Sequence, residues 1–413
     1  MSSSVLEAGS NLQEGQWREL LTRAIFEHCK WDPQCEDHAV LAKFPLFLNA
    51  STLEELASLA ENLSREAFEA ETEILRNPSL LHHLSLPREI GRALQQASLE
   101  NDSSSNVRVM RFDFHYTRDG WQISEVNADV PGGYIEGSGW SELLSHEYSG
   151  VACPQSPTRS YVEAISKMVP SGGQIALAHA TVYSEDRQVM VHLGREMRRQ
   201  GLNPSLVSPA QVRWNQGRAS FSSNFARGNL AMVVRLLPAE WLPLMCPREV
   251  WIRWFTGSET PLSNPGRALV LQSKRFPLVW SELKADLRTW RQLLPVSCCP
   301  TELRNPFRDD YVLKPAFGRV GEDIGIPGIT NEHAYREIVH AARAHPQRWV
   351  AQRRFETVPI DTDDGPVYPC IGVFTVNGKM GGVYGRVAFS QLVDENALDV
   401  AVLVRSEKPE SVQ

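Results

Sequence analysis

The chain has 413 residues, a length that can support two or three domains with a large hydrophobic core. Its formal net charge of -7 at pH 7 argues against a protein that follows nucleic-acid phosphates, because such proteins need a basic face. Hydrophobic residues make up 42% and charged residues 22% of the sequence, which is typical of globular proteins without long disordered segments.

No targeting segment or membrane span is expected. The N-terminus, Met1 to Glu7, lacks a basic region followed by an apolar run, so no secretory signal is predicted. The most apolar window, 230–245, is interrupted by two prolines, an arginine and a glutamate, which argues against a transmembrane helix. The seven cysteines show no Cys-x-x-Cys spacing. Reduced thiols and a cytoplasmic location are therefore expected.

The first hundred residues are predicted to be mainly helical. Ser51 to Glu54 fits a capping box, and the apolar residues that follow it, up to Leu75, recur at helical spacing. Pro87 suits the first turn of another helix. His82 and His83 precede it without a third ligand at a recognisable spacing, so we interpret them as surface or core residues rather than metal ligands.

The segment 107–129 is predicted to form a β-hairpin. Aromatic and β-branched residues alternate with polar ones on both sides of residues 118–120, Arg-Asp-Gly, which suit a three-residue loop. Such a loop pairs Thr117 with Trp121 and thereby sets the register of the two strands. The strand ends before Gly132–Gly139, a glycine-rich stretch that either allows a ligand to approach the backbone closely or forms a tight connection.

Two carboxylates face each other in this register. Asp113 lies opposite Glu125 and Arg111 lies opposite Asn127, all on one face because strand side chains alternate. Like charges opposed across a ladder are destabilising, so the pair calls for a cation. Carboxylate and amide oxygens suit Mg²⁺, and the nearby arginine suits phosphate. A solvated salt-bridge network is the alternative explanation of the same four residues.

A βαβ unit with a parallel sheet is predicted next, from a buried strand at 174–179, a helix at 187–200 and a second strand at 206–207. Ligands of such sheets gather beyond the carboxyl ends of the strands, where Glu185 and Asp186 lie. These acids are candidate contacts for a cationic group. Alternatively, they are first-turn acids that complement the helix dipole.

The next stretch offers a third strand and a linker. The strand is predicted at 230–237 and contains Arg235, which must pair with an acid or a ligand if it is buried. The stretch 261–266, Pro-Leu-Ser-Asn-Pro-Gly, is the best linker candidate.

The C-terminal part contains a strand at 311–315 that leads into the glycine-containing loop 316–323. Backbone N–H groups of such loops can hold phosphates, and Lys314 at the base of the loop can reach one, although a hairpin with a mobile turn is the alternative. Asn377-Gly378 predicts a two-residue hairpin turn. The acidic residues within 361–364 are interpreted as a solvated surface turn.

These motifs together resemble the synthetase part of the glutathionylspermidine synthase family of ATP-grasp ligases, over about 107–404. The family's Arg-x-Asp-Phe strand and Glu-x-Asn-Ala-Asp segment are matched at 111–114 and 125–129. The resemblance implies that Arg111 stabilises the transferring phosphate. It also implies that Mg²⁺ is held by Asp113, Glu125 and Asn127.

The resemblance also implies where ATP and the substrate bind. Lys314-Pro315 and the Gly-Arg-Val-Gly stretch 318–321 are similar to the family's nucleotide-binding strand and lid. Arg267 is an alternative to Lys274 for one nucleotide contact. The implied nucleotide contacts are Lys274, Lys314, Gly318, Arg319, Gly321, Gln352 and Leu392, and the candidate substrate residues are Glu185, Asp186 and Arg386.

The implied fold class is α/β of mixed α+β character: an ATP-grasp fold with a pre-ATP-grasp-like βαβ region and a helical N-terminal segment. The expected regions are 1–105, mainly helical; 106–260, the metal-binding hairpin with the βαβ substrate-side region; and 261–413, the nucleotide-binding region with its glycine-rich lid. The implied activity is an ATP-dependent carboxylate–amine ligase that forms an amide bond through an acyl phosphate, with ATP and Mg²⁺ as cofactors.

Two departures from the family bear on the substrates. Arg353-Arg354 stands where the family has an acid or glutamine, and 130–136 replaces a serine-containing stretch that contacts glutathione. We therefore expect a small acid other than glutathione together with a small amine. Nucleic-acid and membrane partners are not expected, and the oligomeric state is open. The alternatives are a protein that binds Mg-ATP without ligase activity and a small-molecule phosphotransferase.

Overall fold

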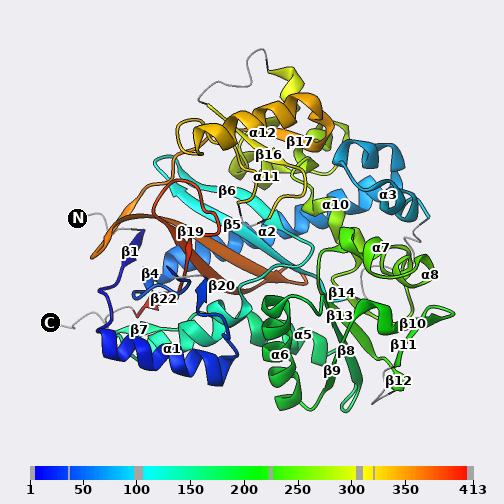
Figure 1. Ribbon diagram of the computed structural model, residues 1–413, viewed down its shortest axis with the longest axis horizontal. Helices are drawn as coiled ribbons and strands as arrows, with labels where there is room; N and C mark the ends of the chain where they lie inside the picture. Colours follow the sequence, from blue (N-terminus) through cyan, green and yellow to red (C-terminus); the bar gives the residue numbers. More distant parts are fainter. Residues whose placement is uncertain are drawn as a thin grey trace.

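The computed structural model describes residues 5–35, 38–96, 106–222, 227–303, 310–319 and 321–406. Its centre is an antiparallel sheet in the order β21-β20-β19-β5-β6, with β18 on β19, and the long helix α2 packs against β19 and β20 (Figure 1). Strands of the two expected regions 106–260 and 261–413 share this sheet. Its strands are β5 (Val109–Thr117), β6 (Gly120–Asn127), β18 (Ile360–Thr362), β19 (Gly365–Val376), β20 (Lys379–Ala388) and β21 (Leu398–Val400).

The predicted hairpin forms, but its turn is one residue shorter than expected. Thr117 pairs with Gly120, not with Trp121, because Gly120 has a φ of +99° and closes a two-residue turn. The register then shifts by one residue at Ser124, between the Phe114 and Asp113 pairs. This β-bulge restores the predicted register at the polar end of the hairpin.

The N-terminal region is mainly helical, as predicted. Its long helix begins two residues earlier than the proposed capping box, because the Asn49 side chain accepts the Thr52 backbone N–H at 2.8 Å. The predicted cap at Ser51 is therefore wrong, since Ser51 already lies within the helix. His82 and His83 are exposed in a 3-10 helix that follows. The helices are α1 (Glu14–His28), α2 (Ala50–Arg76), η1 (Pro78–Leu84) and α3 (Arg88–Leu94).

The predicted βαβ unit is confirmed as part of a parallel sheet in the order β14-β13-β8-β9. The linker prediction for 261–266 is wrong. Ser263 and Asn264 are buried, and the segment contributes a strand to this sheet. The elements are α5 (Pro157–Ser166), β8 (Gln174–His179), α6 (Ser184–Arg199), β9 (Asn203–Val207), β13 (Met232–Leu236) and β14 (Leu262–Ser263).

A third sheet carries the predicted strand at 311–315. Its order is β15-β17-β16, and α12 packs on it through an apolar cluster that includes Leu313, Ile338 and Trp349. Figure 1 shows this unit above the central sheet and the parallel sheet below and to its right. The elements are β15 (Ser297–Cys298), β16 (Tyr311–Pro315), α12 (Glu332–Ala344) and β17 (Trp349–Arg353).

Short elements complete the molecule. The predicted turn at Asn377-Gly378 is confirmed, since Val376 pairs with Lys379 and both turn residues have positive φ.

None of the described helices is both long and apolar enough to cross a membrane. The remaining strands are β1 (Leu6–Ala8), β2 (Gln34–Cys35), β3 (His38–Ala39), β4 (Leu46–Leu48), β7 (Val151–Ala152), β10 (Val212–Asn215), β11 (Arg218–Ser222), β12 (Arg227–Asn229) and β22 (Val402–Arg405), and the remaining helices are η2 (Glu136–Trp140), α4 (Ser141–Ser145), η3 (Pro209–Gln211), η4 (Ala239–Trp241), α7 (Leu242–Met245), α8 (Arg248–Trp251), α9 (Arg253–Thr256), η5 (Gly266–Ala268), α10 (Leu269–Gln272), η6 (Phe276–Glu282), α11 (Arg288–Leu293), η7 (Pro300–Glu302) and η8 (Pro346–Arg348).

Candidate functional site

A cavity of about 1370 Å³ collects side chains from the hairpin, the first turn of α6, the loop after β16, and the strands β17 and β20. These segments are far apart in the sequence, so the cavity depends on how the central sheet, the parallel sheet and the β15-β17-β16 sheet pack together. Most of the residues predicted for the site line it. They are Arg111, Asp113, Glu125, Asn127, Glu185, Asp186, Lys314, Arg319, Gly321, Gln352, Arg386 and Leu392.

Asp113 is held from two sides by polar side chains of the hairpin. Arg111 donates to both of its carboxylate oxygens, Nε to Oδ1 at 2.7 Å and Nη2 to Oδ2 at 2.9 Å. Asn127 donates to Oδ2 at 3.0 Å. The guanidinium of Arg111 also stacks over the Tyr384 ring, 4.9 Å from its centre. Alternation along β5 and β6 therefore places three predicted residues in one polar group.

The second carboxylate, Glu125, pairs with a lysine from another part of the chain. Lys274 Nζ lies 2.9 Å from Glu125 Oε2 and donates to the Gly318 carbonyl at 2.6 Å. Burial alone would raise the pKa of Glu125, but the charges of Lys274 and Lys314 lower it to about 2. Glu125 is therefore ionised at neutral pH.

Lys314 lies deep in the same part of the cavity. It donates to the Ser124 carbonyl at 3.0 Å and to Gln352 Oε1 at 2.6 Å. Burial lowers its pKa to about 8, with Lys274 acting in the same direction and Glu125 opposing it. The ammonium thus remains charged at neutral pH but with little margin, so small changes in its surroundings alter its charge.

The cation that the opposed carboxylates require is supplied here by Arg111 on one side and Lys274 on the other. The donor set also fits Mg²⁺, because Asp113, Glu125 and Asn127 present hard oxygen ligands on one face of the hairpin. Oε1 of Glu125 accepts no hydrogen bond from the described residues. The magnesium assignment stays a prediction.

The structure separates the two alternatives for the second nucleotide contact. Lys274 lies against Glu125 and the glycine-rich loop, whereas Arg267 pairs with Glu71 at 3.2 Å. Geometry therefore favours Lys274.

The glycine-rich loop lines the cavity, and Gly321 lies close to the chain segment 393–394. Gly321 has a φ of +73°, and a Cβ at this position would lie 2.8 Å from the Asp394 Cα atom. A side chain at 321 would clash with backbone, so this close approach requires glycine. Val320 lies outside the described residues, and Gly318 contributes its carbonyl to Lys274.

The candidate substrate residues lie in two places. Glu185 and Asp186 occupy the first turn of α6 at the cavity edge, as both the functional and the helix-dipole interpretations expected. Burial, with Glu185 nearby, raises the pKa of Asp186 to about 7. Arg386 donates to the Asp394 carbonyl at 2.6 Å and lies 3.9 Å from Asp399.

Sequence reasoning missed a second charged group on the cavity wall. Lys30 pairs with Glu136 at 2.7 Å and lies 3.6 Å from Asp399, whose Oδ1 accepts from the Tyr384 hydroxyl at 2.5 Å. Lys30 comes from the N-terminal region, which carried no motif that could have indicated it. Cys370, on β19, also lines the cavity, and burial raises the pKa of its thiol well above the usual value. That shift disfavours a thiolate nucleophile.

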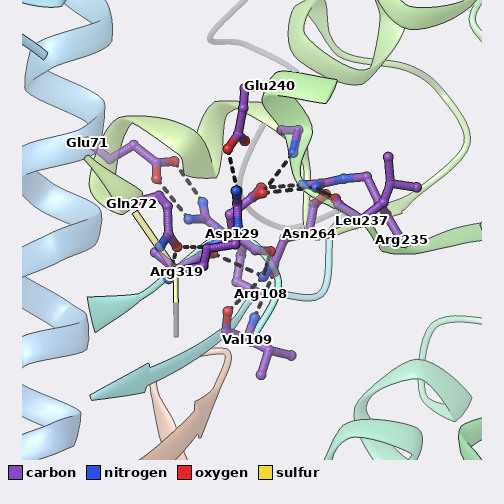
Figure 2. A network of polar contacts seen from close by, with 12 residues as sticks. Glu71, Arg108, Val109, Asp129, Arg235, Leu237, Glu240, Asn264, Gln272 and Arg319 are labelled. Atoms are coloured by element: carbon purple, nitrogen blue, oxygen red, sulfur yellow. Dashed lines mark hydrogen bonds and ion pairs between the residues drawn. The ribbon is translucent and has the colours of Figure 1, made fainter. Parts of the chain in front are cut away.

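The predicted need for a partner at Arg235 is confirmed. Arg235 forms two contacts with Asp129, at 2.5 and 3.1 Å, directly after the hairpin (Figure 2). Asn264, in the stretch predicted as a linker, bonds the backbone of Val109 and of Asp129, and Gln272 accepts the Asp129 backbone N–H at 3.0 Å. This network fixes the end of the hairpin against the parallel sheet.

The chain belongs to the glutathionylspermidine synthase pre-ATP-grasp family, whose model matches residues 13–404. No curated protein matches the sequence. Among solved structures, a glutathione synthetase-like effector from Globodera pallida in the apo form is similar with a TM-score of 0.62 at 14% identity, over 95% of this chain and 98% of that chain. A putative gamma-glutamylcysteine synthetase from Methylobacillus flagellatus KT, at 14% identity over 79% of this chain and 83% of that chain, has a TM-score of 0.41, too low to carry an argument.

The predicted α/β ATP-grasp fold is thereby confirmed. Family membership supports a ligase-type function. The structural similarity at 14% identity bears on the fold alone.

Proposed function

We propose that the protein is an ATP-dependent ligase that joins a small carboxylic acid to a small amine through an acyl phosphate, with release of ADP and phosphate. The observation that carries the proposal is the junction of the paired acids Asp113 and Glu125 with three cations, Arg111, Lys274 and Lys314, in one largely buried region. An array of this kind suits phosphoryl transfer, which needs charge neutralisation and positioning more than covalent help from the protein.

In the proposed reaction a substrate carboxylate oxygen attacks the γ-phosphorus of ATP, and the bond from that phosphorus to the ADP oxygen breaks. The amine nitrogen then attacks the acyl carbon, loses a proton, and displaces phosphate. Magnesium, when held by Asp113, Glu125 and Asn127, would neutralise charge on phosphate oxygens. Lys274 and Lys314 would bind the phosphate tail in place of their present carbonyl and amide partners.

Arg111 has a distinct role in the proposal. Its donors already meet Asp113 and the Gly132 carbonyl, and Tyr384 supports its guanidinium plane. A guanidinium held on several sides is preorganised for charge that develops during transfer, because it needs little rearrangement at that moment. No side-chain nucleophile is required, which agrees with the raised pKa of the Cys370 thiol in its buried setting.

The acyl phosphate would need protection from water. The glycine-rich loop lines the cavity beside 393–394, and Gln352 and Leu392, the expected contacts of the nucleotide, line the same cavity. Enclosure by these segments would limit hydrolysis of the intermediate. On the amine side, Glu185 and Asp186 supply negative charge that favours a cationic amine.

The test is a product search. The protein is incubated with Mg-ATP and a pool of amino acids, small peptides and polyamines, and condensation products that require ATP are sought by mass. We expect an ATP-dependent adduct and stoichiometric ADP with wild-type protein, and neither with Asp113→Ala. Circular dichroism and the unfolding midpoint establish that the variant is folded.

Two outcomes would replace the proposal. A phosphorylated acceptor without any amine-dependent adduct would identify a phosphotransferase. Tight binding of Mg-ATP without ADP release across the whole pool would identify a nucleotide-binding protein without ligase activity. ATP turnover retained in Asp113→Ala would contradict the magnesium assignment.

A further inference from the structure

One ion pair connects the glycine-rich loop to the parallel-sheet side of the cavity. Arg319 Nη2 donates to Glu240 Oε1, and the Arg319 guanidinium lies over the Trp241 ring, 5.5 Å from its centre. Trp241 in turn packs on Tyr183, with ring centres 5.6 Å apart. The loop is therefore attached at its arginine to η4.

The position of Glu240 is itself fixed by the end of the magnesium-site hairpin. The backbone N–H of Ala239 donates to Asp129 Oδ2 at 2.8 Å, and Asp129 is locked by Arg235 (Figure 2). Asp129 follows the predicted ligand Asn127 by two residues. The chain of contacts thus runs from the hairpin through η4 to Arg319.

Burial makes this pair sensitive to loss of either partner. The Glu240 side chain is 12% exposed and that of Arg319 is 32% exposed. Burial raises the pKa of Glu240 while Arg319 opposes the shift. Without the arginine, Glu240 would be a mostly buried carboxylate beside Asp129, which is costly.

The ion pair with Glu240 uses only one of the N–H donors of Arg319. Arg319 lines the cavity, and apart from the Nη2 N–H that meets Glu240 its N–H groups donate to no acceptor in the part of the chain that the structure describes. A guanidinium has five N–H donors in a planar fork, and it can hold a carboxylate with one and an anion with others.

We propose that Glu240 is a positioning residue that holds Arg319 over the cavity so that its remaining donors face the phosphates of the nucleotide. The half of this inference that concerns phosphate rests on the proposed function. The half that concerns the attachment of the loop does not, and it can be measured in unliganded protein.

The experiment compares wild type with Glu240→Ala, Glu240→Gln, Arg319→Ala and the double variant Glu240→Ala/Arg319→Ala. Glu249→Ala is the matched control, because Glu249 is an exposed acid on α8 nine residues away. The first measurement is hydrogen exchange of backbone amides in 316–323 without ligand. The second is the dissociation constant of Mg-ATP by titration, and, once a product is known, the KM for ATP and kcat separately.

We expect faster amide exchange in the loop for Glu240→Ala but not for Glu249→Ala. The dissociation constant of Mg-ATP should rise about tenfold in Glu240→Ala, the effect expected for losing a hydrogen bond to a charged group, with kcat changed less. Glu240→Gln, which keeps an acceptor, should recover part of the affinity. The double variant should be no weaker than Arg319→Ala, because Glu240 acts through that arginine.

The outcomes separate this inference from the proposed function. Unchanged exchange and unchanged Mg-ATP affinity in Glu240→Ala would overturn the inference while leaving the ligase proposal intact. Additive losses in the double variant would also overturn it, since Glu240 would then act independently of Arg319. Faster exchange in a protein that binds no Mg-ATP even as wild type would overturn the phosphate half together with the proposed function.

Discussion

The phosphate end of the cavity and its acidic rim use carboxylates in opposite ways. At the phosphate end, which we define as Asp113, Glu125, Asn127, Lys274 and Lys314, each carboxylate is neutralised within 3 Å, Asp113 by Arg111 at 2.7 Å and Glu125 by Lys274 at 2.9 Å. At the acidic rim, which consists of Glu185 and Asp186, neither acid forms an ion pair with any residue that the structure describes.

The pKa values show the same contrast. Burial acts to raise the pKa of both Glu125 and Asp186. At Glu125 the charges of two lysines outweigh burial, and the pKa is about 2. Beside Asp186 stands another acid, and the pKa is about 7. A ligand that binds at the phosphate end must therefore displace the present ion-pair partners of these side chains. A cation that binds at the rim meets acids that have no ion-pair partner among the described residues.

The largest effect is expected for Asp113→Asn. This variant keeps the size of the side chain but removes the negative charge that Arg111 and the metal would share. We expect ADP formation to fall roughly 10²–10³-fold, as for loss of one preorganised electrostatic group. The same change at the rim, Asp186→Asn, should leave the maximal rate nearly unchanged. Rates at saturating substrates and the unfolding midpoints of both variants are compared, and equal losses of rate would abolish the distinction between the two regions.

Local periodicity could predict the hairpin part of the phosphate end, whereas Lys274 was expected only from the family resemblance. Alternation along two adjacent strands fixes which of the residues share a face, and Asp113 and Glu125 pair as predicted. The predicted hairpin turn was one residue too long, and the β-bulge at Ser124 compensated for this error. A bulge of this kind has no local sequence signal, so the correct pairing at the site depended on two compensating features.

Long-range partners were beyond local patterns. Lys30, near the N-terminus, meets Glu136 and Asp399 from distant parts of the chain, and no spacing links them. Asn264 was assigned to a linker because proline and glycine flank it, although its amide is buried against Val109. Burial of that amide is set by tertiary packing, which overrides the local preference of such residues for loops.

A pH titration sharpens the comparison at the phosphate end. Burial lowers the pKa of Lys314 to about 8, so the ammonium is charged below that pH and loses its charge above it. Because phosphate binding needs the charged form, the dissociation constant of Mg-ATP should be constant below about pH 8 and then rise by up to about tenfold per pH unit.

Lys314→Met tests the assignment of this titration. The variant should bind Mg-ATP more weakly at pH 7 and show no inflection near pH 8. Lys284→Met serves as the control, because Lys284 is exposed and does not line the cavity. An inflection that survives in Lys314→Met would assign the titration to another group.

The smallest expected effect lies at the acidic rim. Asp186→Asn should raise the KM for a cationic amine by up to about fivefold, since partly exposed ion pairs contribute little.

The pKa of Asp186 is raised to about 7, so its carboxyl is protonated below that pH and charged above it. In wild type the KM for a polyamine from the screened pool should therefore fall as the pH rises through about 7, and this fall should be reduced in Asp186→Asn. Asp286→Asn, at an exposed acid outside the cavity lining, controls for general charge. If the KM for ATP changed instead, the rim would belong to the nucleotide, because an acid that binds only the amine has no reason to affect ATP.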